Sequence, residues 1–383
     1  MVEKDSQEHI VEQARAFAEK EIRPHAAGWD EKEAMPENFI VKLAEKKFLT
    51  PSFPDKYGGL ELDPLYQGRL IEQIGKECCS TRVLITVHGS LVGESILRWG
   101  TEDQRERWLG EMSSGKKIGA FALSEPGAGS DARSIQMSYK RKGRQFILNG
   151  KKKWISFGEI ADLYLTLASG EQGITAFLVE RDYDGVKTKP IRGLLASRAS
   201  HMAEVEFRSV AVPEENMLGQ LGTGFSYVAA SALDHGRYCV AWGGLAVAQE
   251  ALEAMVRFAR ERSQFGQKIH RFQLIRGIIG DAVAKTQAAR ALCERAGEMR
   301  KIKDPEAIIE TAAAKYFASK VAGEVAADAV QIHGAAGCTG RFPVERLYRE
   351  AKVLEIVEGT SQILQELMAN YGLRRYFRHG NRK

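Results

Sequence analysis

One carboxylate near the end of the sequence is placed where it could act as a base. Residues 355–362 read EIVEGTSQ, so that Glu358 stands in a short polar segment directly before Gly359. The pattern that follows predicts a helix that starts near Thr360, and the first turn of a helix has free N–H groups that bind polar ligands. Glu358 is therefore a candidate catalytic residue, and the alternative is a surface glutamate that precedes a helix.

Two segments in the middle of the chain contain residue types that contact ligands. Residues 121–131 read FALSEPGAGSD, in which Gly127 and Gly129 allow a close approach of the backbone to a ligand. Residues 153–156 read KWIS, and Trp154 and Ser156 are two apart, so that in a strand their side chains face the same way. The alternatives are a plain glycine-rich turn and a tryptophan in the core of a sheet.

Single arginines are the basic residues that stand out. Arg262, in RSQFG, is always charged and has the geometry to bind a phosphate through two hydrogen bonds. Arg82, in STRVLITVHGSLV, lies in a predicted helix. Without other signals, each would be interpreted as an arginine at a helix end or on a helix surface.

The composition excludes several classes of protein. The chain has 383 residues, 55 Lys and Arg against 50 Asp and Glu, and a formal net charge of +5, which gives no support for nucleic-acid binding. No apolar run reaches the roughly 18 residues of a transmembrane helix. The first residues carry charges of both signs without an apolar stretch, so no secretory signal is expected. We therefore expect a cytoplasmic protein that does not bind membranes.

Metal, disulfide and nucleotide motifs are also missing from the sequence. The five cysteines are odd in number and form no CxxC pair, so that neither a disulfide framework nor a zinc site is expected. The histidines have no metal-ligand spacing, and no HExxH, P-loop or GxSxG motif occurs. Gly127 and Gly129 supply only the first half of a GxGxxG fingerprint. Nicotinamide binding, phosphoryl transfer and metal-dependent hydrolysis are thus unsupported.

Three zones of different periodicity must position the candidate residues. Apolar residues recur at helical spacing in residues 1–116, alternate as in strands in residues 117–222, and return to helical spacing in residues 223–383. Asn149 and Gly150 form the strongest short hairpin signal of the middle zone. The order of helices, sheet and helices predicts an α+β fold with an N-terminal α-helical domain, a middle antiparallel β-domain and a C-terminal helical domain.

In this order and at these separations, the segments FALSEPGAGSD, KWIS, RSQFG and EIVEGTSQ resemble those of the acyl-CoA dehydrogenase flavoprotein family. The resemblance runs from PDKYGG at residue 54 to the last predicted helix. It implies an acyl-CoA dehydrogenase-like fold whose C-terminal domain is a four-helix bundle, and a homo-oligomer, either dimer or tetramer. It also implies FAD as the cofactor, bound between the middle and C-terminal domains and reaching a neighbouring subunit.

The resemblance implies roles for individual residues. Those that would contact FAD are Phe121, Leu123, Ser124, Trp154, Ser156, Arg262, Phe265, Gln273, Gln331, Gly334, Thr360 and Gln362. Those that would contact the substrate are Arg82, Ser130, Asp234 and Arg237. The sequence departs from the family at Ser156, where threonine is usual, and at Ala335 and Ala336, which replace part of a glycine turn. Gly236 occupies the position from which some members supply the base, which leaves Glu358 without a competitor.

The reaction that the resemblance implies is the oxidation of an acyl thioester. Glu358 would remove a proton next to the thioester carbonyl in a dry pocket, and hydride would pass from the β-carbon to flavin N5. The enolate would accept hydrogen bonds from the ribityl 2′-hydroxyl of FAD and from the backbone N–H of Glu358. An electron-transfer flavoprotein or another acceptor would reoxidise the flavin.

Two branches of the family are similar to the chain in more detail. Arg82 and Trp242, the latter in GRYCVAWGGLAV, resemble residues of the carrier-protein-linked dehydrogenases that form hydroxymalonyl or methoxymalonyl extender units in polyketide biosynthesis. The same residues and the run RAS at 198–200 resemble the glutaryl-CoA type, in which the arginine holds a distal carboxylate.

These likenesses predict oxidation of a short polar acyl group on an acyl carrier protein, with Arg82 beside that group. One alternative is catabolic desaturation of glutaryl-CoA or of a short or branched acyl-CoA. Others are a non-catalytic, oxidase or monooxygenase member of the fold, and the presence of Glu358 disfavours the monooxygenase.

Overall fold

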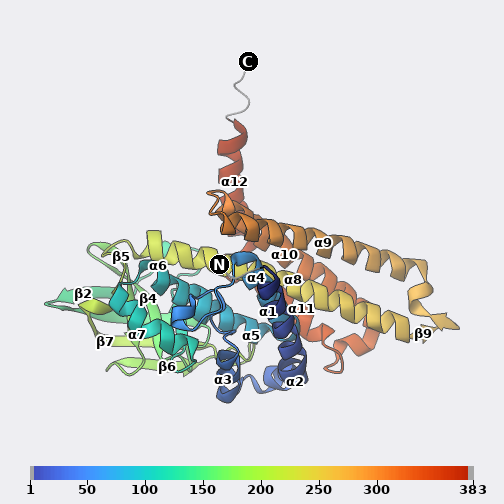
Figure 1. The fold of residues 1–383 in the computed structure, drawn as a ribbon, viewed down its shortest axis with the longest axis horizontal. Coiled ribbons are helices and arrows are strands. Elements are labelled where there is room, and N and C mark those ends of the chain that lie inside the picture. The colour runs from blue at the N-terminus through green and yellow to red at the C-terminus, as the bar shows by residue number, and fades with distance from the viewer. Residues whose placement is uncertain (1–3, 378–383) are drawn as a thin grey trace. The chain divides into compact units, whose positions relative to one another are not determined.

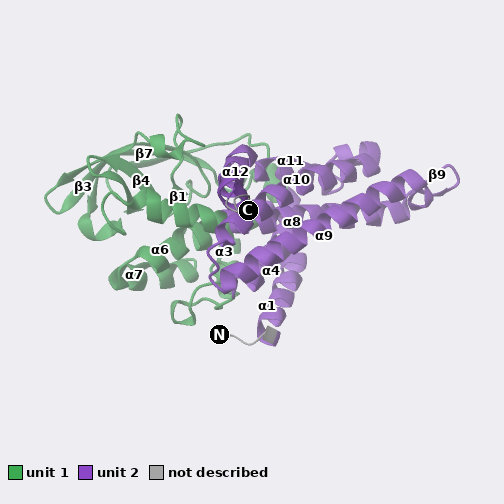
Figure 2. Cartoon of the chain, turned by 90° about the horizontal axis from the view of Figure 1, so that it is seen from above, with its two compact units in different colours: residues 1–3, 28–62, 80–236 green, residues 4–27, 63–79, 237–383 purple. Residues whose placement is uncertain are grey.

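The computed structural model describes residues 4–377, which fold into two compact units (Figure 2). The first unit consists of residues 28–62 and 80–236, and the second of residues 4–27, 63–79 and those from 237 onward. The N-terminal helical zone thus contributes to both units. None of the described helices is both long and apolar enough to cross a membrane.

The first unit is built around one sheet (Figure 1). Its strands follow the order β6-β7-β3-β2-β4-β5-β8, with β1 beside β4. Their bounds are β1 Gly119–Ala122, β2 Ser138–Lys142, β3 Gln145–Ile155, β4 Leu163–Gly170, β5 Gly173–Glu180, β6 Val186–Pro190, β7 Ala203–Pro213 and β8 Met217–Leu218. The predicted β-domain is confirmed, and most of its pairings are antiparallel, but β1 and β2 each pair with β4 in parallel.

Strand β4 shows why this sheet lies inside its unit. The strand is LYLTLASG, and the residues of its first part are buried on both faces of the sheet. Leu163 and Leu165 pack in one core with Trp108, whereas Tyr164 packs in a second core with Phe177. A strand that is apolar on both faces must be covered on both, and each fully buried side chain of this size contributes about 1.5–3 kcal/mol.

Helices of the same unit are α3 (Glu37–Glu45), the π-helix η3 (Ile85–Gly93), α6 (Glu94–Trp99) and α7 (Glu102–Ser113). Every residue of η3 is buried. His88 of η3 joins it to the sheet, because its Nδ1 accepts from the Gly119 N–H at 3.0 Å and its Nε2–H donates to the Met112 carbonyl at 3.1 Å. Burial lowers the pKa of His88 to about 4, so that the ring is neutral.

The hairpin predicted at Asn149 and Gly150 is wrong. Both residues lie inside β3, and the turn between β2 and β3 falls at Gly143. Gly150 has φ +151°, and the pairing of β3 with β7 shifts register beside it. A Cβ at Gly150 would lie 2.7 Å from the Met137 Cα. The glycine therefore serves a β-bulge and a close backbone approach rather than a turn.

The second unit is helical (Figure 1). Its helices are α1 Lys4–Phe17, α4 Pro64–Glu77, α9 Gln273–Lys301, α10 Ala307–His333, α11 Val344–Leu354, α12 Ser361–Phe377 and the larger part of α8 Ala230–Glu261. The chain passes between the units within α2 (Arg23–Lys32), α5 (Cys79–Leu84) and α8. The predicted return to helices after the sheet is confirmed.

Small residues set the spacing of these helices. A Cβ at Gly244 of α8 would lie 2.8 Å from the Ala318 backbone carbon of α10, so the two backbones touch. Gly68 of α4 likewise leaves room for the ring of Trp242, which is fully buried. Trp242, which carried part of the likeness to the two family branches, thus packs between helices of the second unit.

Candidate functional site

The loop that carries Glu358 joins α11 to α12 in the second unit. Glu358 has φ +55° and Gly359 has φ +100°, so two successive residues adopt the left-handed backbone conformation. For a glutamate this conformation costs about 1–3 kcal/mol. The Ile363 N–H donates to Thr360 Oγ1 at 3.3 Å, and α12 begins at Ser361. The helix start predicted near Thr360 is thus confirmed.

Two cationic side chains hold the backbone of this loop. Arg237 Nε donates to the Glu358 carbonyl at 3.0 Å, and Lys315 Nζ donates to the Gly359 carbonyl at 2.8 Å. Lys315 is 0% exposed, and burial lowers its pKa to about 8 although the Glu358 carboxylate opposes the shift. The structure therefore brings Arg237, which the resemblance assigned to the substrate, beside Glu358, and it adds Lys315.

Sequence reasoning missed Lys315, although a signal for it exists. The residue stands in AAAKYFAS, and the positions one helical turn before and after it, Thr311 and Ala318, are both 0% exposed. Lys315 thus lies in the middle of a buried stripe of small residues on α10. Because lysine is almost never fully buried without a partner, a lysine at helical spacing within such a stripe indicates a specific role.

In the first unit, the FALSEPGAGSD segment begins within β1 and is fixed by β3. Leu123 is 5% exposed and packs in the core. Its carbonyl accepts a hydrogen bond from Lys152 Nζ at 2.9 Å, and the same ammonium contacts Glu125 Oε1 at 2.8 Å. The Ser124 carbonyl accepts from the Lys153 N–H at 2.9 Å. Strand β3 therefore holds the backbone of Leu123 and Ser124, the two residues that the resemblance places at the flavin.

Lys152 and Glu125 form a buried ion pair that sequence reasoning also missed. Lys152 is 0% and Glu125 8% exposed. The Glu125 carboxylate also accepts from the Gln136 N–H at 2.7 Å and from the Met137 N–H at 3.0 Å. Burial lowers the pKa of Lys152 to about 8, and Glu125 opposes this shift. The pair ties the glycine-rich segment to β3 and to the two residues that precede β2.

The glycines that follow leave space beside the backbone. Glu125 and Ala128 exchange backbone hydrogen bonds of 2.9 and 3.3 Å in a tight turn. Within the described chain, no atom outside the immediate neighbours lies within 4 Å of a Cβ built at Gly127 or Gly129. Ser130 is exposed. A ligand can therefore approach this backbone closely.

Trp154 and Ser156 do not share the face of one regular strand, so that prediction is wrong. β3 ends at Ile155, and its register against β7 shifts between Lys152 and Ile155. Trp154 has φ +63° and is 53% exposed. The Ser156 hydroxyl donates to Met202 Sδ at 4.0 Å. The bulge breaks the period of two on which the prediction depended, and it leaves the indole ring accessible.

Arg82 lies in α5 and is buried, with 2% of its surface exposed, so the surface-arginine alternative is wrong. Within residues 4–377 its guanidinium has no hydrogen-bond or ion-pair partner, and its Nε is a buried donor without an acceptor. Asp234 is half-buried at the start of α8. Phe121, in β1, is half-buried and packs beside Ala232.

A hairpin of the second unit gathers three of the residues that the resemblance assigned to FAD. Arg262 follows α8, Phe265 stands in the turn of β9 (Ser263–Gln264) and β10 (Gln267–Lys268), and Gln273 begins α9. Phe265 has φ +51°, is 93% exposed and meets Phe272 edge-on at 6.2 Å. Arg262 is exposed and, in the part of the chain that the structure describes, forms no ion pair.

The remaining predicted residues lie at two helix ends of the same unit. Gln331 is exposed in the last turn of α10, and Gly334, with φ +59°, follows the end of this helix. Thr360 and Gln362 flank Ser361 at the start of α12. The Ser361 hydroxyl is buried and has no hydrogen-bond partner among the described residues.

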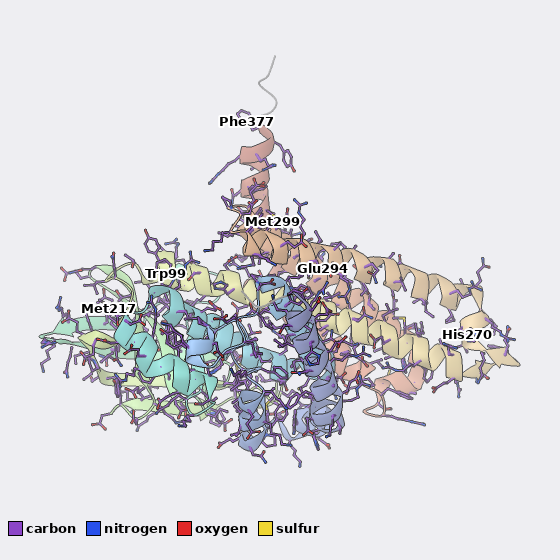
Figure 3. All side chains as sticks on the ribbon, in the orientation of Figure 1. Trp99, Met217, His270, Glu294, Met299 and Phe377 are labelled. Atoms are coloured by element: carbon purple, nitrogen blue, oxygen red, sulfur yellow. The ribbon has the colours of Figure 1, made fainter. Side chains whose placement is uncertain are left out.

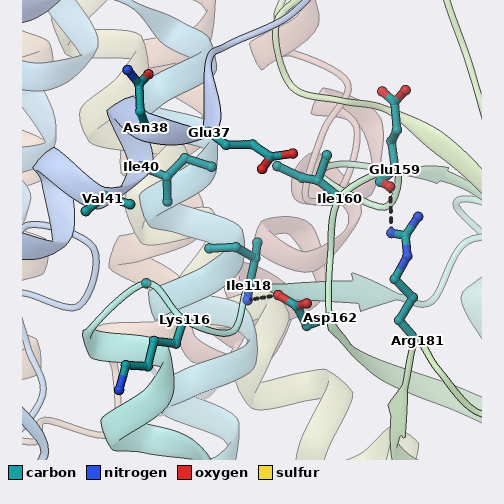
Figure 4. A pocket seen from close by; sticks show the side chains of 11 residues that line it. Glu37, Asn38, Ile40, Val41, Lys116, Ile118, Glu159, Ile160, Asp162 and Arg181 are labelled. Atoms are coloured by element: carbon teal, nitrogen blue, oxygen red, sulfur yellow. Dashed lines mark hydrogen bonds between the residues drawn. The ribbon is translucent and has the colours of Figure 1, made fainter.

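A pocket in the first unit contains none of the predicted site residues (Figure 4). It has a volume of about 620 Å³. It is lined by Glu37, Asn38, Ile40, Val41, Gly115, Lys116, Ile118, Glu159, Ile160, Asp162 and Arg181. Two of its polar side chains are used by the fold, because Asp162 accepts from the Ile118 N–H at 2.8 Å and Arg181 donates to the Glu159 carbonyl at 2.6 Å. Within residues 4–377, no group of three His, Cys, Asp or Glu side chains could hold a metal ion.

Comparison with known proteins identifies the family. The N-terminal, middle and C-terminal domain families of acyl-CoA dehydrogenase match residues 4–116, 120–210 and 222–373. The short-chain specific acyl-CoA dehydrogenase of Clostridium acetobutylicum is 35% identical over 93% of this chain and 95% of its own length. The solved butyryl-CoA dehydrogenase of Megasphaera elsdenii is 33% identical, covers 98% of this chain and all of its own, and has a TM-score of 0.93.

Three other solved structures bear on substrate and partner. One, described as the electron transferring flavoprotein of Acidaminococcus fermentans, contains a chain 36% identical, with a TM-score of 0.94 over 98% of this chain and 99% of its own. A glutaryl-coenzyme A dehydrogenase in complex with glutaryl-CoA is 31% identical, with a TM-score of 0.92 over 100% and 98%. FkbI, for biosynthesis of a methoxymalonyl extender unit, is 29% identical, with a TM-score of 0.88 over 94% and 99%.

The chain belongs to the acyl-CoA dehydrogenase family, whose members are FAD-dependent oxidoreductases that act on the CH–CH bond of acyl-CoA. The residues of this structure fit FAD. Arg262 offers an exposed guanidinium to a pyrophosphate, and Trp154 and Phe265 expose ring faces. The orphaned Ser361 hydroxyl lies between two residues that the resemblance assigned to the cofactor.

Proposed function

We propose that the chain oxidises a short acyl thioester whose acyl group ends in a polar or acidic function, with Glu358 as the base and Arg82 as the residue that binds that end. FAD, when bound, supplies the two-electron acceptor. Glu358 removes the proton next to the thioester carbonyl. Arg237 and the loop carbonyls fix the backbone from which the carboxylate projects.

Arg82 is the observation that carries the choice of substrate. A guanidinium with 2% exposure and no partner among residues 4–377 is unfavourable, because a buried charge costs several kcal/mol unless an opposite charge or acceptors compensate it. A carboxylate or another acceptor on the substrate would provide two parallel hydrogen bonds. An apolar butyryl group would leave this arginine without a partner.

Coenzyme A is the carrier that the comparisons favour, since the relatives at 33–35% identity carry short-chain acyl-CoA and butyryl-CoA names. Acyl carrier protein is the second candidate. The likeness to FkbI, described as serving the biosynthesis of a methoxymalonyl extender unit, supports a place for the chain in polyketide extender-unit formation. For reoxidation we propose an electron-transferring flavoprotein, supported by the likeness to a chain of the Acidaminococcus structure.

We further propose that the chain works as a homo-oligomer. Large apolar side chains are exposed on the second unit at Leu274 (84%), Leu373 (73%) and Phe377 (75%), the last at the end of α12 (Figure 3). Phe265, at 93%, stands beside Arg262 on the same unit. Exposed apolar side chains of this kind favour burial against another copy, and FAD contacts from Arg262 to a neighbouring subunit would follow.

Anaerobic bleaching of the flavin tests the function. Butyryl-CoA, glutaryl-CoA and the same acyl groups on an acyl carrier protein are offered in parallel to the FAD-loaded protein. We expect glutaryl thioesters to bleach the flavin with a higher kcat/KM than butyryl thioesters. Comparison of the same acyl group on CoA and on acyl carrier protein then shows which carrier the protein uses. Glu358→Gln should retain FAD and lose bleaching. A flavin that no acyl thioester bleaches would refute the proposal.

The role of Arg82 requires a matched control. Arg82→Met should lower kcat/KM for the acidic acyl thioester by about 100-fold, the range expected when one partner of a buried charge pair is removed. The same change should alter the value for butyryl-CoA by less than about threefold. Arg98→Met, at an exposed position of the same unit, should change neither. Equal losses with both substrates would show that Arg82 is structural.

A further inference from the structure

We propose that Lys315 is a positioning residue for Glu358, whose ammonium group holds the Gly359 carbonyl and thereby fixes the left-handed turn that presents the carboxylate. This inference rests on the proposed function, in which Glu358 is the base. Lys315 belongs to none of the motifs that identified the family.

The surroundings of Lys315 show that packing alone does not require it. It is 0% exposed, and its neighbours along the buried stripe of α10 are Thr311, Ala318 and Ala322, all 0% exposed. Its Nζ makes one hydrogen bond in the described chain, 2.8 Å to the Gly359 carbonyl, and no ion pair. An ammonium has three donors and is expensive to bury, so an apolar side chain would stabilise the helix packing better. The hydrogen bond to the Gly359 carbonyl therefore explains why a charged side chain stands at position 315.

The loop needs such a contact because its backbone is strained. Glu358 and Gly359 have φ of +55° and +100°. The carbonyls of these two residues are held from two different helices, by Arg237 of α8 at 3.0 Å and Lys315 of α10 at 2.8 Å. The peptide that joins the two residues cannot rotate without breaking one of these bonds. Together they fix the peptide groups on both sides of Gly359, and with them the turn from which the Glu358 side chain projects.

The charge of Lys315 also faces a defined set of groups. Glu358 of the loop and Glu355 after α11 raise its pKa, Arg237 of α8 lowers it, and burial outweighs them all, with the result near 8. The ammonium therefore loses its proton as the pH rises through about 8. The neutral amine keeps a donor but no longer attracts the carbonyl or the carboxylate as a charge does. The rate of flavin reduction should decline as the pH rises through about 8.

The experiment compares Lys315→Met and Lys315→Gln with Lys320→Met, an exposed lysine of the same helix. Each FAD-loaded protein is measured for flavin reduction by butyryl-CoA at pH 6.5–9.5, and for hydrogen exchange of peptides that cover residues 353–364. Exchange needs no substrate, so it reports on the loop even if butyryl-CoA reacts slowly. Bound FAD and Tm verify folding.

We expect Lys315→Met to lower the rate of flavin reduction by roughly 10- to 100-fold at little change in KM, the loss typical of a misplaced catalytic group. Exchange at residues 353–364 should accelerate at least tenfold, and the decline in rate near pH 8 should disappear. Lys315→Gln, which keeps a donor without the charge, should recover part of the rate and of the exchange protection. Lys320→Met should behave as the unaltered protein.

Two results would overturn the inference: unchanged exchange in Lys315→Met, or faster exchange with an unchanged rate and pH profile. If Lys315→Met does not fold, Lys315→Gln decides by the same criteria. Failure of the proposed function looks different, because Glu358→Gln would then reduce its flavin as fast as the unaltered protein. An inactive Glu358→Gln beside a fully active Lys315→Met would refute only the role of Lys315.

Discussion

Removal of the buried ammonium of Lys152 should destabilise the protein strongly. Lys152→Met leaves the Leu123 carbonyl without its donor at 2.9 Å, and the Glu125 carboxylate without its counter-charge at 2.8 Å. Glu125 retains two backbone N–H donors, but it is only 8% exposed and water cannot replace the ammonium. Breaking a buried pair from one side costs about 3–5 kcal/mol. At roughly 2–4 °C per kcal/mol, the Tm should fall by about 6–20 °C.

Thermal melting followed by circular dichroism measures this effect, with bound flavin as a second readout. Lys151→Met is the matched control. Lys151 is half-exposed, and its ion pairs with Glu206 at 3.4 Å and Glu204 at 3.9 Å are each worth under about 1 kcal/mol. The double variant Lys152→Met with Glu125→Gln should recover part of the loss, because no unpaired charge stays buried. If Lys152→Met melts within 2 °C of Lys151→Met, the reasoning about this pair is wrong.

Other predictions concern the backbone and the buried histidine. Gly150→Ala should lower the stability by about 2 kcal/mol or more in urea unfolding, because φ is +151° and the new Cβ would lie 2.7 Å from the Met137 Cα. Gly110→Ala, on an open helix face, should instead stabilise by about 0.5–1 kcal/mol. Burial lowers the pKa of His88 to about 4, below the value of about 6.5 in an unfolded chain, so its contribution to stability is lost as the pH falls from 6.5 toward 4. In urea unfolding, the loss of stability between pH 7 and pH 4.5 should be smaller in His88→Gln than in the unaltered protein.

The order of elements was predictable because it depends on periodicity, which the sequence contains. LYLTLA at β4 is a short apolar run, whereas the segment around Ala318 keeps a helical spacing over a long stretch, so that length and periodicity together favour one element type for each. Asn149 and Gly150 misled the prediction because the same dipeptide suits a turn and a bulge. Which one forms is decided by β7, whose backbone pairs across this point and shifts register there. Local sequence does not contain that partner.

The candidate site likewise contains residues that the sequence indicates and residues whose surroundings only the fold determines. Glu358, Trp154 and Arg262 stand in motifs, so their importance could be inferred from residue type and order. The surroundings of Arg82 could not, because a helix with an arginine gives no indication of whether the guanidinium is exposed or enclosed. Its burial without a partner among residues 4–377 follows from packing around α5. This observation supports the substrate-binding role that the resemblance implied, against that of a surface charge.

Lys152 and Lys315 share a feature that motifs cannot reveal. Each is 0% exposed, each has a pKa lowered by burial to about 8, and each donates to a backbone carbonyl in a segment assigned to the site, Leu123 in one unit and Gly359 in the other. Every residue type has a backbone carbonyl, so the sequence of the accepting segment does not indicate that such a hydrogen bond forms. The only signal is a lysine at a position where the periodicity predicts a buried side chain. That period is two residues in β3 and 3.6 residues in α10. Such lysines should be sought wherever a motif requires an unusual backbone, because the backbone must be held by donors from outside the motif.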